Sequence, residues 1–327
     1  MLRTRFTELV GVNHPLVCGG MHHVGRAELV SAVANAGALG FLTALTQPTP
    51  DDLAKEIARC RGMTDKPFGV NLTILPTLKP VPYDEYLDAA LDGGIKLIET
   101  AGYNPEPYLP RIKAAEAKLI HKCTSVRHAV KAEKIGCDAV SIDGFECAGH
   151  PGEDDVPGLI LIPAAAEQLT IPMVASGGFG DARGLVAALA LGADGINMGT
   201  RFMVTQEAPI HDNVKQAAVA ANERDTQLIF RPLRNTARIF KNGVAIKVAE
   251  MEARPGGATI DDLKPLVAGY EGRKLMDEGD MEAGIWSAGQ VIGLIHDIPT
   301  VAELVSRIVA DAEAIMEKRF GAMRATG

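Results

Sequence analysis

The chain has 327 residues, 47% of them apolar, so it can bury one large core or one large core with a smaller appendage. Its 41 acidic and 33 basic residues give a formal charge of -8, and no local basic stripe compensates for it, so we expect no nucleic-acid partner. The longest apolar stretch, residues 184–193, is far shorter than the roughly 20 residues needed to cross a bilayer. We therefore expect no membrane span.

The cysteines and the amino-terminal segment predict where the protein works. The five cysteines are scattered and include no Cys-x-x-Cys pair, so they give no sign of zinc or of a redox dithiol. Arg3, Arg5 and Glu8 stand where a secretory signal would have an apolar run. We expect a cytoplasmic protein without a metal site.

Eight short apolar runs, each ending in glycine or a polar residue, are predicted to be β-strands. They span residues 16–19, 40–43, 68–72, 96–100, 118–122, 139–143, 173–177 and 195–199. They recur on average every ~26 residues, which is the length of a strand, a helix and two short loops. This regular spacing predicts parallel pairing.

The segments between these runs are predicted to be helices, because their apolar residues recur at three- and four-residue spacing. The clearest are residues 26–36, 50–61, 126–134, 159–169 and 181–191. An open doubly wound sheet usually shows a topological break and a glycine fingerprint after its first strand, and neither is evident here. We therefore predict an α/β fold, a (β/α)8 TIM barrel.

The regular spacing stops after Arg201, and this predicts three parts. Residues 1–204 would form the barrel, with residues 73–83 as an inserted lid loop stiffened by three prolines. Residues 205–284 would form a smaller, mostly helical domain that closes over the active site. Residues 285–327 would return to the barrel as helices, because residues 301–319 have regular apolar spacing.

Two neighbouring strands of the predicted barrel end in glycine. Ser176-Gly177-Gly178 follows the seventh strand, and Met198-Gly199-Thr200 follows the eighth. Glycine lets backbone amides approach an anion, and the following helix points its positive end toward it. Either turn alone could be only a tight connection, but the pair predicts a phosphate site, of a kind that FMN enzymes and many sugar-phosphate enzymes share.

Other strand ends carry groups that suit a flavin ring. Lys122 ends the fifth strand, where its charge could stabilise the negative charge that develops on flavin reduction. Its alternative role is a salt bridge to Asp143 or Glu99. Gly20 and Met21, after the first strand, would allow close approach of the ring to backbone and sulfur.

The loop of residues 143–152 is too long and too rich in glycine for a simple strand-to-helix turn. It carries His150, which could act as a general base or donate to a bound oxyanion. A lone histidine is usually structural, but the place of His150 between Gly149 and Pro151 after a barrel strand also suits a catalytic role, and both interpretations stay open.

The loop 143–152, together with Ser176-Gly177-Gly178 and residues 197–201, resembles the nitronate monooxygenase family, formerly called 2-nitropropane dioxygenases. Within that family the chain is most similar to the bacterial FMN-dependent NADH:quinone reductases. Residues 70–73, 76–77, 120–124, 233–238 and 284–289 carry this similarity, which extends over nearly the whole chain.

The resemblance implies non-covalent FMN, with NADH as the co-substrate that gives a hydride and a quinone that receives two electrons. It places a set of residues against FMN: Gly20, Met21, His22, Asn71, Lys122, Asp143, Ala148, Gly149, Ser176, Gly177, Gly178, Met198, Gly199 and Thr200. Pro76, Thr77 and Trp286 are expected to close over the nicotinamide, which binds as a visiting substrate because no two-domain dinucleotide fingerprint is present.

Several alternatives stay open. In nitronate monooxygenases a histidine at the position of His150 is the base that starts oxidation of a nitronate or nitroalkane with O2, so His150 is the candidate catalytic residue. A flavin enoyl-thioester reductase is more remote, because it would need a basic docking patch for its acyl carrier. A phosphate-binding barrel enzyme without a flavin is the remaining alternative, and a homodimer is compatible with the sequence.

Overall fold

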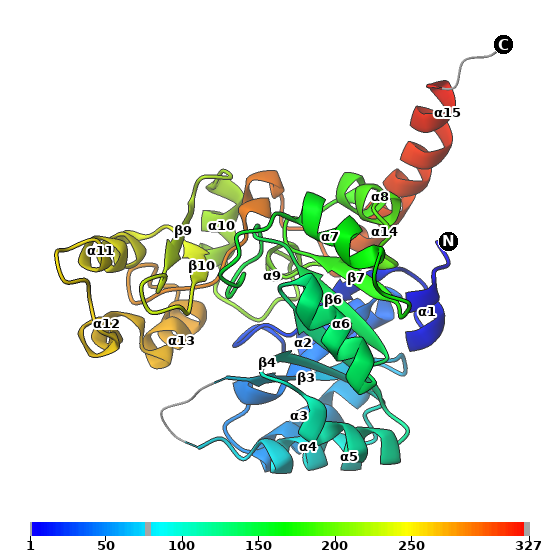
Figure 1. Cartoon of the computed structure of the whole chain (residues 1–327), viewed down its shortest axis with the longest axis horizontal. Helices are drawn as coiled ribbons and strands as arrows, with labels where there is room; N and C mark the ends of the chain where they lie inside the picture. Colours follow the sequence, from blue (N-terminus) through cyan, green and yellow to red (C-terminus); the bar gives the residue numbers. More distant parts are fainter. Residues whose placement is uncertain (1, 76–79, 324–327) are drawn as a thin grey trace.

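The computed structural model describes residues 2–75 and 80–323. Eight parallel strands form a closed barrel in which each strand pairs with the next and β8 pairs with β1 (Figure 1). The strands are β1 Leu16–Cys18, β2 Leu39–Thr43, β3 Gly69–Ile74, β4 Leu97–Gly102, β5 Lys118–Cys123, β6 Ala139–Asp143, β7 Met173–Ser176 and β8 Gly195–Asn197. The predicted (β/α)8 barrel is confirmed, with strand ends shifted by up to two residues.

Apolar packing closes the amino end of the barrel. Phe6 and Val10 of α1 (Arg5–Val10) join a buried cluster with strand residues that include Phe41 and Val174. The Arg5 guanidinium also pairs with Asp194, just before β8, at 2.8 Å. Because this end is sealed, the carboxyl ends of the strands are left to form a site.

Helices cover the outside of the barrel, since the strands are apolar on both faces and must be buried on both. They are α2 Ala27–Asn35, α3 Pro50–Arg61, α4 Tyr83–Asp92, α5 Leu109–Ala114, α6 Val126–Ile135, α7 Gly158–Ala166 and α8 Ala182–Ala190, with short 3-10 turns at Ala44–Thr46 and Glu106–Tyr108. None of the helices in the described residues is both long and apolar enough to cross a bilayer.

Beyond the barrel, the chain forms helices and one small sheet, which lies with α11, α12 and α13 on one side of the barrel (Figure 1). The elements are α9 Thr200–Met203, α10 Asp212–Ala220, β9 Thr226–Ile229, β10 Ala237–Phe240, α11 Gly243–Glu252, α12 Ile260–Val267 and α13 Gly269–Glu278. The antiparallel β9–β10 pair was not predicted, because strands of four residues are too short for a clear alternation. Ile229 and Ile239 pack with Val248 and Leu263 in a core of their own.

The carboxyl-terminal part returns to the barrel through a 3-10 turn, Gln290–Leu294, and α14, Val301–Ala314. Helix α14 buries Leu304, Val305 and Ile308 and contacts α8 and α2. The predicted single helix to residue 319 changes instead at Ile315 into a π-helical turn and then α15 Phe320–Ala322. This last stretch projects away from the barrel (Figure 1), so none of its described side chains is buried.

Candidate active site

A cavity of about 590 Å³ lies at the carboxyl ends of the barrel strands. One wall comes from the barrel, through residues that directly follow β1, β6, β7 and β8. The opposite wall comes from α12 and α13, including Val267, Gly272 and Met276, and from the segment around Trp286. The cavity is therefore shared between the barrel and the part of the chain that follows it.

The structure brings most of the predicted site residues to this one cavity. Its lining includes Gly20, Met21, His22, Lys122, Asp143, Ala148, Gly149, His150, Ser176, Gly177, Gly178, Gly199, Thr200 and Trp286. Asn71 and Met198 are each only 1% exposed and do not line it. Pro76 and Thr77 lie outside the described residues.

The two glycine turns lie side by side, since Ser176 of β7 is paired with Asn197 of β8. Gly177 and Gly178 adopt left-handed backbone angles, with φ of 84° and 83°. A Cβ on Gly177 would stand 2.8 Å from the Gly144 carbonyl oxygen, so only glycine fits there. The Thr200 hydroxyl oxygen accepts the Gly289 amide at 3.0 Å, which ties the second turn to the Trp286 segment. Together the turns form one wall of the cavity, where backbone amides can donate hydrogen bonds to a bound anion.

Lys122 reaches the cavity as a half-buried cation. Burial alone would lower the pKa of Lys122, but the negative charges of Asp143 and Glu99 outweigh it and raise that pKa. In the described part of the chain neither carboxylate forms an ion pair with Lys122, so the salt bridge considered as its alternative role is absent. The ammonium group stays protonated and free to meet a ligand.

Among the described residues, four buried polar atoms near this cavity have no partner: His23 Nε2, Asp143 Oδ1, Glu99 Oε1 and Trp286 Nε1. A buried polar atom without a hydrogen bond costs free energy. Asp143 and Trp286 line the cavity, so a bound ligand can supply what they lack. The Asp143 carboxylate could accept hydrogen bonds from the ribityl hydroxyls of FMN. The Lys122 cation fits the flavin ring, and the two glycine turns fit the phosphate.

His150 is held in place from outside the barrel. The neighbouring Gly149 exchanges backbone hydrogen bonds with Arg238 of β10, at 3.0 and 2.6 Å. The Arg238 side chain also donates to the Phe145 carbonyl at 2.9 Å, and Thr236 donates to Glu153 through its amide at 2.8 Å. The β9–β10 sheet therefore fixes the loop that carries His150. The sequence did not indicate this support, because β10 was not predicted.

The surroundings of His150 keep its ring neutral near pH 7. Desolvation lowers the pKa of His150 below its ordinary value of 6.5, and the charge of Glu153 only partly opposes this. The ring is shielded from bulk water but stays accessible from the cavity that it lines. A neutral, accessible imidazole can accept a proton from a substrate.

The structure adds residues to the site that were not predicted. His23, Phe179, Met276 and Ile285 all line the cavity. Burial, followed by the nearby His22, lowers the pKa of His23 to about 4. His23 has a left-handed φ of 65°, which the sequence alone does not predict.

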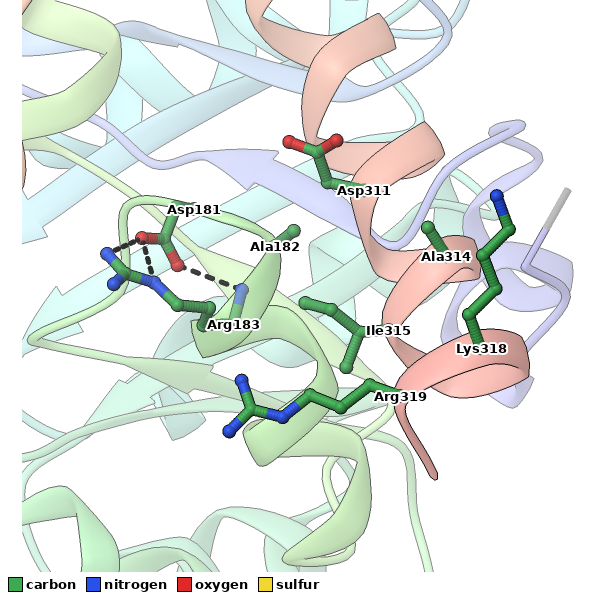
Figure 2. Close-up of a pocket in the computed structure, with 8 residues that line it drawn as sticks. All are labelled: Asp181, Ala182, Arg183, Asp311, Ala314, Ile315, Lys318 and Arg319. Carbon is green, nitrogen blue, oxygen red and sulfur yellow. Dashed lines mark hydrogen bonds and ion pairs between the residues drawn. The ribbon is translucent and has the colours of Figure 1, made fainter. Parts of the chain in front are cut away.

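A second hollow, of about 610 Å³, lies on the outside of the barrel between α8 and α14 (Figure 2). It is lined by Ala182 and Ile315 and by charged side chains, among which Arg183 pairs with Asp181. No strand end reaches it. Among the described residues no group of three or more His, Cys, Asp or Glu side chains could hold a metal ion.

Comparison with known proteins gives consistent results. The sequence matches the family model for nitronate monooxygenase over residues 3–311. It is 33% identical to a (3aS,4S,5R,7aS)-5-hydroxy-7a-methyl-1-oxo-octahydro-1H-indene-4-carboxyl-CoA dehydrogenase of Rhodococcus jostii, over 99% of both chains. It is 31% identical to a probable nitronate monooxygenase of Staphylococcus saprophyticus, over 97% of this chain and 99% of the relative. The solved structure of FabK from Thermotoga maritima superposes with a TM-score of 0.91 at 34% identity, covering 98% of this chain and all of the other.

Proposed function

The chain belongs to the nitronate monooxygenase family of oxidoreductases, and from this premise we propose that it is an FMN-dependent NADH:quinone reductase. Enzymes of this family are generally FMN-dependent. The observation that carries the proposal is the meeting of two glycine turns, an unpaired lysine and an unsatisfied carboxylate oxygen in one cavity. Those are the groups that a phosphorylated flavin requires.

In this proposal the turns at Gly177, Gly178 and Gly199 hold the phosphate, and Asp143 accepts from ribityl hydroxyls through its unpartnered oxygen. Lys122 supplies a fixed positive charge, which the protein can place where negative charge develops. When bound, FMN supplies the acceptor for a hydride and the store for two electrons.

The remaining lining orients the substrate and excludes water. Leu75, Phe179, Ile239 and Trp286 give the cavity apolar walls. The Tyr83 hydroxyl donates to the Leu75 carbonyl at 3.1 Å and so braces the start of the lid loop. Among the described lining residues Lys122 is the only lysine or arginine, which favours a neutral, planar acceptor such as a quinone over a strongly anionic one.

Nitronate oxidation is the second candidate, and His150 is the observation that favours it. Its neutral ring faces the cavity and can take the proton that a nitroalkane must lose. Hydride transfer from NADH does not require such a base, so in the reductase His150 would bind the substrate or supply a proton. A CoA-thioester substrate is a third candidate, suggested by the name of the R. jostii relative.

A direct comparison on one flavin-loaded sample separates these candidates. NADH should bleach the flavin absorbance under anaerobic stopped-flow conditions, and NADH with benzoquinone should support steady-state turnover. Oxygen consumption with propionate 3-nitronate, in the absence of NADH, would instead assign nitronate oxidation. Bleaching of the flavin by a saturated acyl-CoA in place of NADH, or reduction of an α,β-unsaturated acyl-CoA in preference to benzoquinone, would favour the thioester candidate. A colourless protein that does not bind added FMN would rule out all three.

A further inference from the structure

Glu99 is a buried carboxylate behind Gly20 of the cavity lining, and none of the roles above uses it. It lies in β4 and is 1% exposed. Its Oε2 accepts the Gly20 amide at 2.9 Å and the Asn71 side-chain amide at 2.6 Å. Its other oxygen, Oε1, is buried and has no partner.

These hydrogen bonds join the turn after β1 to the middle of β3 and β4. Asn71 of β3 also accepts the Thr73 hydroxyl through its Oδ1 at 3.0 Å, and Thr73 lines the cavity at the start of the lid loop. The Asn71 side chain lies directly beneath the β1 turn, since a Cβ on Gly20 would stand 2.2 Å from its Cγ. Glu99 therefore fixes Asn71, and through it the backbone that forms the floor at Gly20.

The Glu99 carboxylate also affects the electrostatics around Lys122. After desolvation, the charges of Asp143 and Glu99 are the main influences on Lys122, and both raise its pKa. One half-buried cation is thus influenced by two buried anions. Because Coulomb interactions are strong where water is excluded, removing one of these anions changes the potential throughout the floor.

The charge of Glu99 needs a reason beyond its hydrogen bonds. A glutamine of the same shape could accept both bonds through its amide oxygen, and its burial would cost far less than that of a carboxylate. A carboxyl group kept at this depth with one oxygen unpartnered in the described structure points to a role beyond accepting these two hydrogen bonds.

We propose that Glu99 is a positioning residue for the flavin: it holds Asn71 beneath the Gly20 backbone that lines the cavity, and its negative charge offsets Lys122 and so sets the reduction potential of bound FMN. The proposal rests on the proposed FMN binding, and it is independent of which acceptor the enzyme uses. A negative charge near the ring disfavours the addition of electrons, so Glu99 lowers the potential that Lys122 raises.

The test compares purified wild-type protein, Glu99→Gln and Asp194→Asn after loading with FMN. Asp194 is a matched control, because it is a buried carboxylate, 8% exposed, at the sealed end of the barrel. Glu99→Gln should shift the midpoint potential of FMN to a more positive value and raise the FMN dissociation constant about tenfold, as expected for the loss of a charge-assisted hydrogen bond. Asp194→Asn should lower the melting temperature and leave both flavin properties unchanged.

Asn71→Ala provides a second arm if Glu99→Gln does not fold. It removes the side chain that Glu99 holds beneath Gly20 but keeps the Glu99 carboxylate. FMN should therefore bind more weakly, without a positive shift in its midpoint potential. A midpoint potential in Glu99→Gln equal to that of the wild type, or a positive shift in Asn71→Ala as large as that in Glu99→Gln, would overturn the proposal. A wild-type protein that binds no FMN would instead refute the proposed function itself.

Discussion

At the scale of single residues, surroundings decide what each side chain can do. Lys122 remains charged although it is half-buried, because two carboxylates outweigh its desolvation. Cys147, which lines the same cavity, is a free thiol whose pKa is raised by burial and then by Asp143, so it is not a nucleophile there. Residue type alone would not predict that Lys122 stays charged and that Cys147 is not a nucleophile.

Replacement of Lys122 by methionine tests its electrostatic role. Lys122→Met should lower the midpoint potential of bound FMN and slow anaerobic reduction by NADH at least about tenfold, since a positive charge at the floor of the cavity is lost. Lys118→Met, on the same strand but exposed and outside the cavity, is the control and should resemble the wild type. An unchanged potential in Lys122→Met would remove Lys122 from the flavin site.

His150 separates the two leading activities. His150→Asn should reduce nitronate oxidation by about 100-fold or more if the ring is the base, and should change NADH:benzoquinone turnover much less. In the wild type the pKa of His150 is lowered, so nitronate oxidation should be constant above pH 6.5 and fall only at lower pH, where the ring is protonated. Equal losses of both activities in the variant would contradict this division of roles.

At the scale of elements, short turns define the candidate site and distant elements hold it in place. The turns after β7 and β8 adjoin because their strands are paired. The loop after β6 takes its position from β10 through Gly149 and Arg238. Mutations in either kind of support should therefore weaken ligand binding more than they destabilise the barrel.

Two glycine substitutions should have opposite effects. Among the described residues a Cβ on Gly199 would meet only the flexible Met21 side chain, with Sδ at 3.5 Å. Gly199→Ala should therefore keep its melting temperature but lose at least about tenfold in FMN affinity, because a methyl group narrows the phosphate site. Gly136→Ala has open space around it but a φ of 103°. It should cost about 1 kcal/mol of stability and leave FMN affinity unchanged. Wild-type FMN affinity in Gly199→Ala would place the phosphate elsewhere.

At the scale of the whole molecule, buried neutral histidines link stability to pH. Burial lowers the pKa of His121 to about 4, and its ring shares a hydrogen bond of 2.8 Å with the Thr100 hydroxyl. The unfolded chain binds a proton at this histidine near pH 6.5, whereas the folded one does not until about pH 4. The folded state therefore loses stability as pH falls through this window.

Urea unfolding at pH 7 and pH 5 measures this effect. The free energy of unfolding of the wild type should fall on acidification, and His121 alone should account for about 2 kcal/mol of the loss. His121→Gln should show a correspondingly smaller decrease, whatever its stability at pH 7. His296→Gln, which changes an exposed histidine, is the control and should follow the wild-type profile. A variant profile parallel to the wild type would show that the pKa of His121 is not lowered in the folded state.

The sequence by itself determined the barrel, the order of its strands and the two glycine turns, because periodicity and glycine chemistry act over a few residues. It also indicated Lys122 and His150 as polar side chains at strand ends. The tertiary structure decided which groups meet: Glu99 binds the amide of Gly20, 79 residues away, and Arg238 supports a loop 93 residues away. Such contacts depend on how the elements pack, and no local pattern in the chain encodes them.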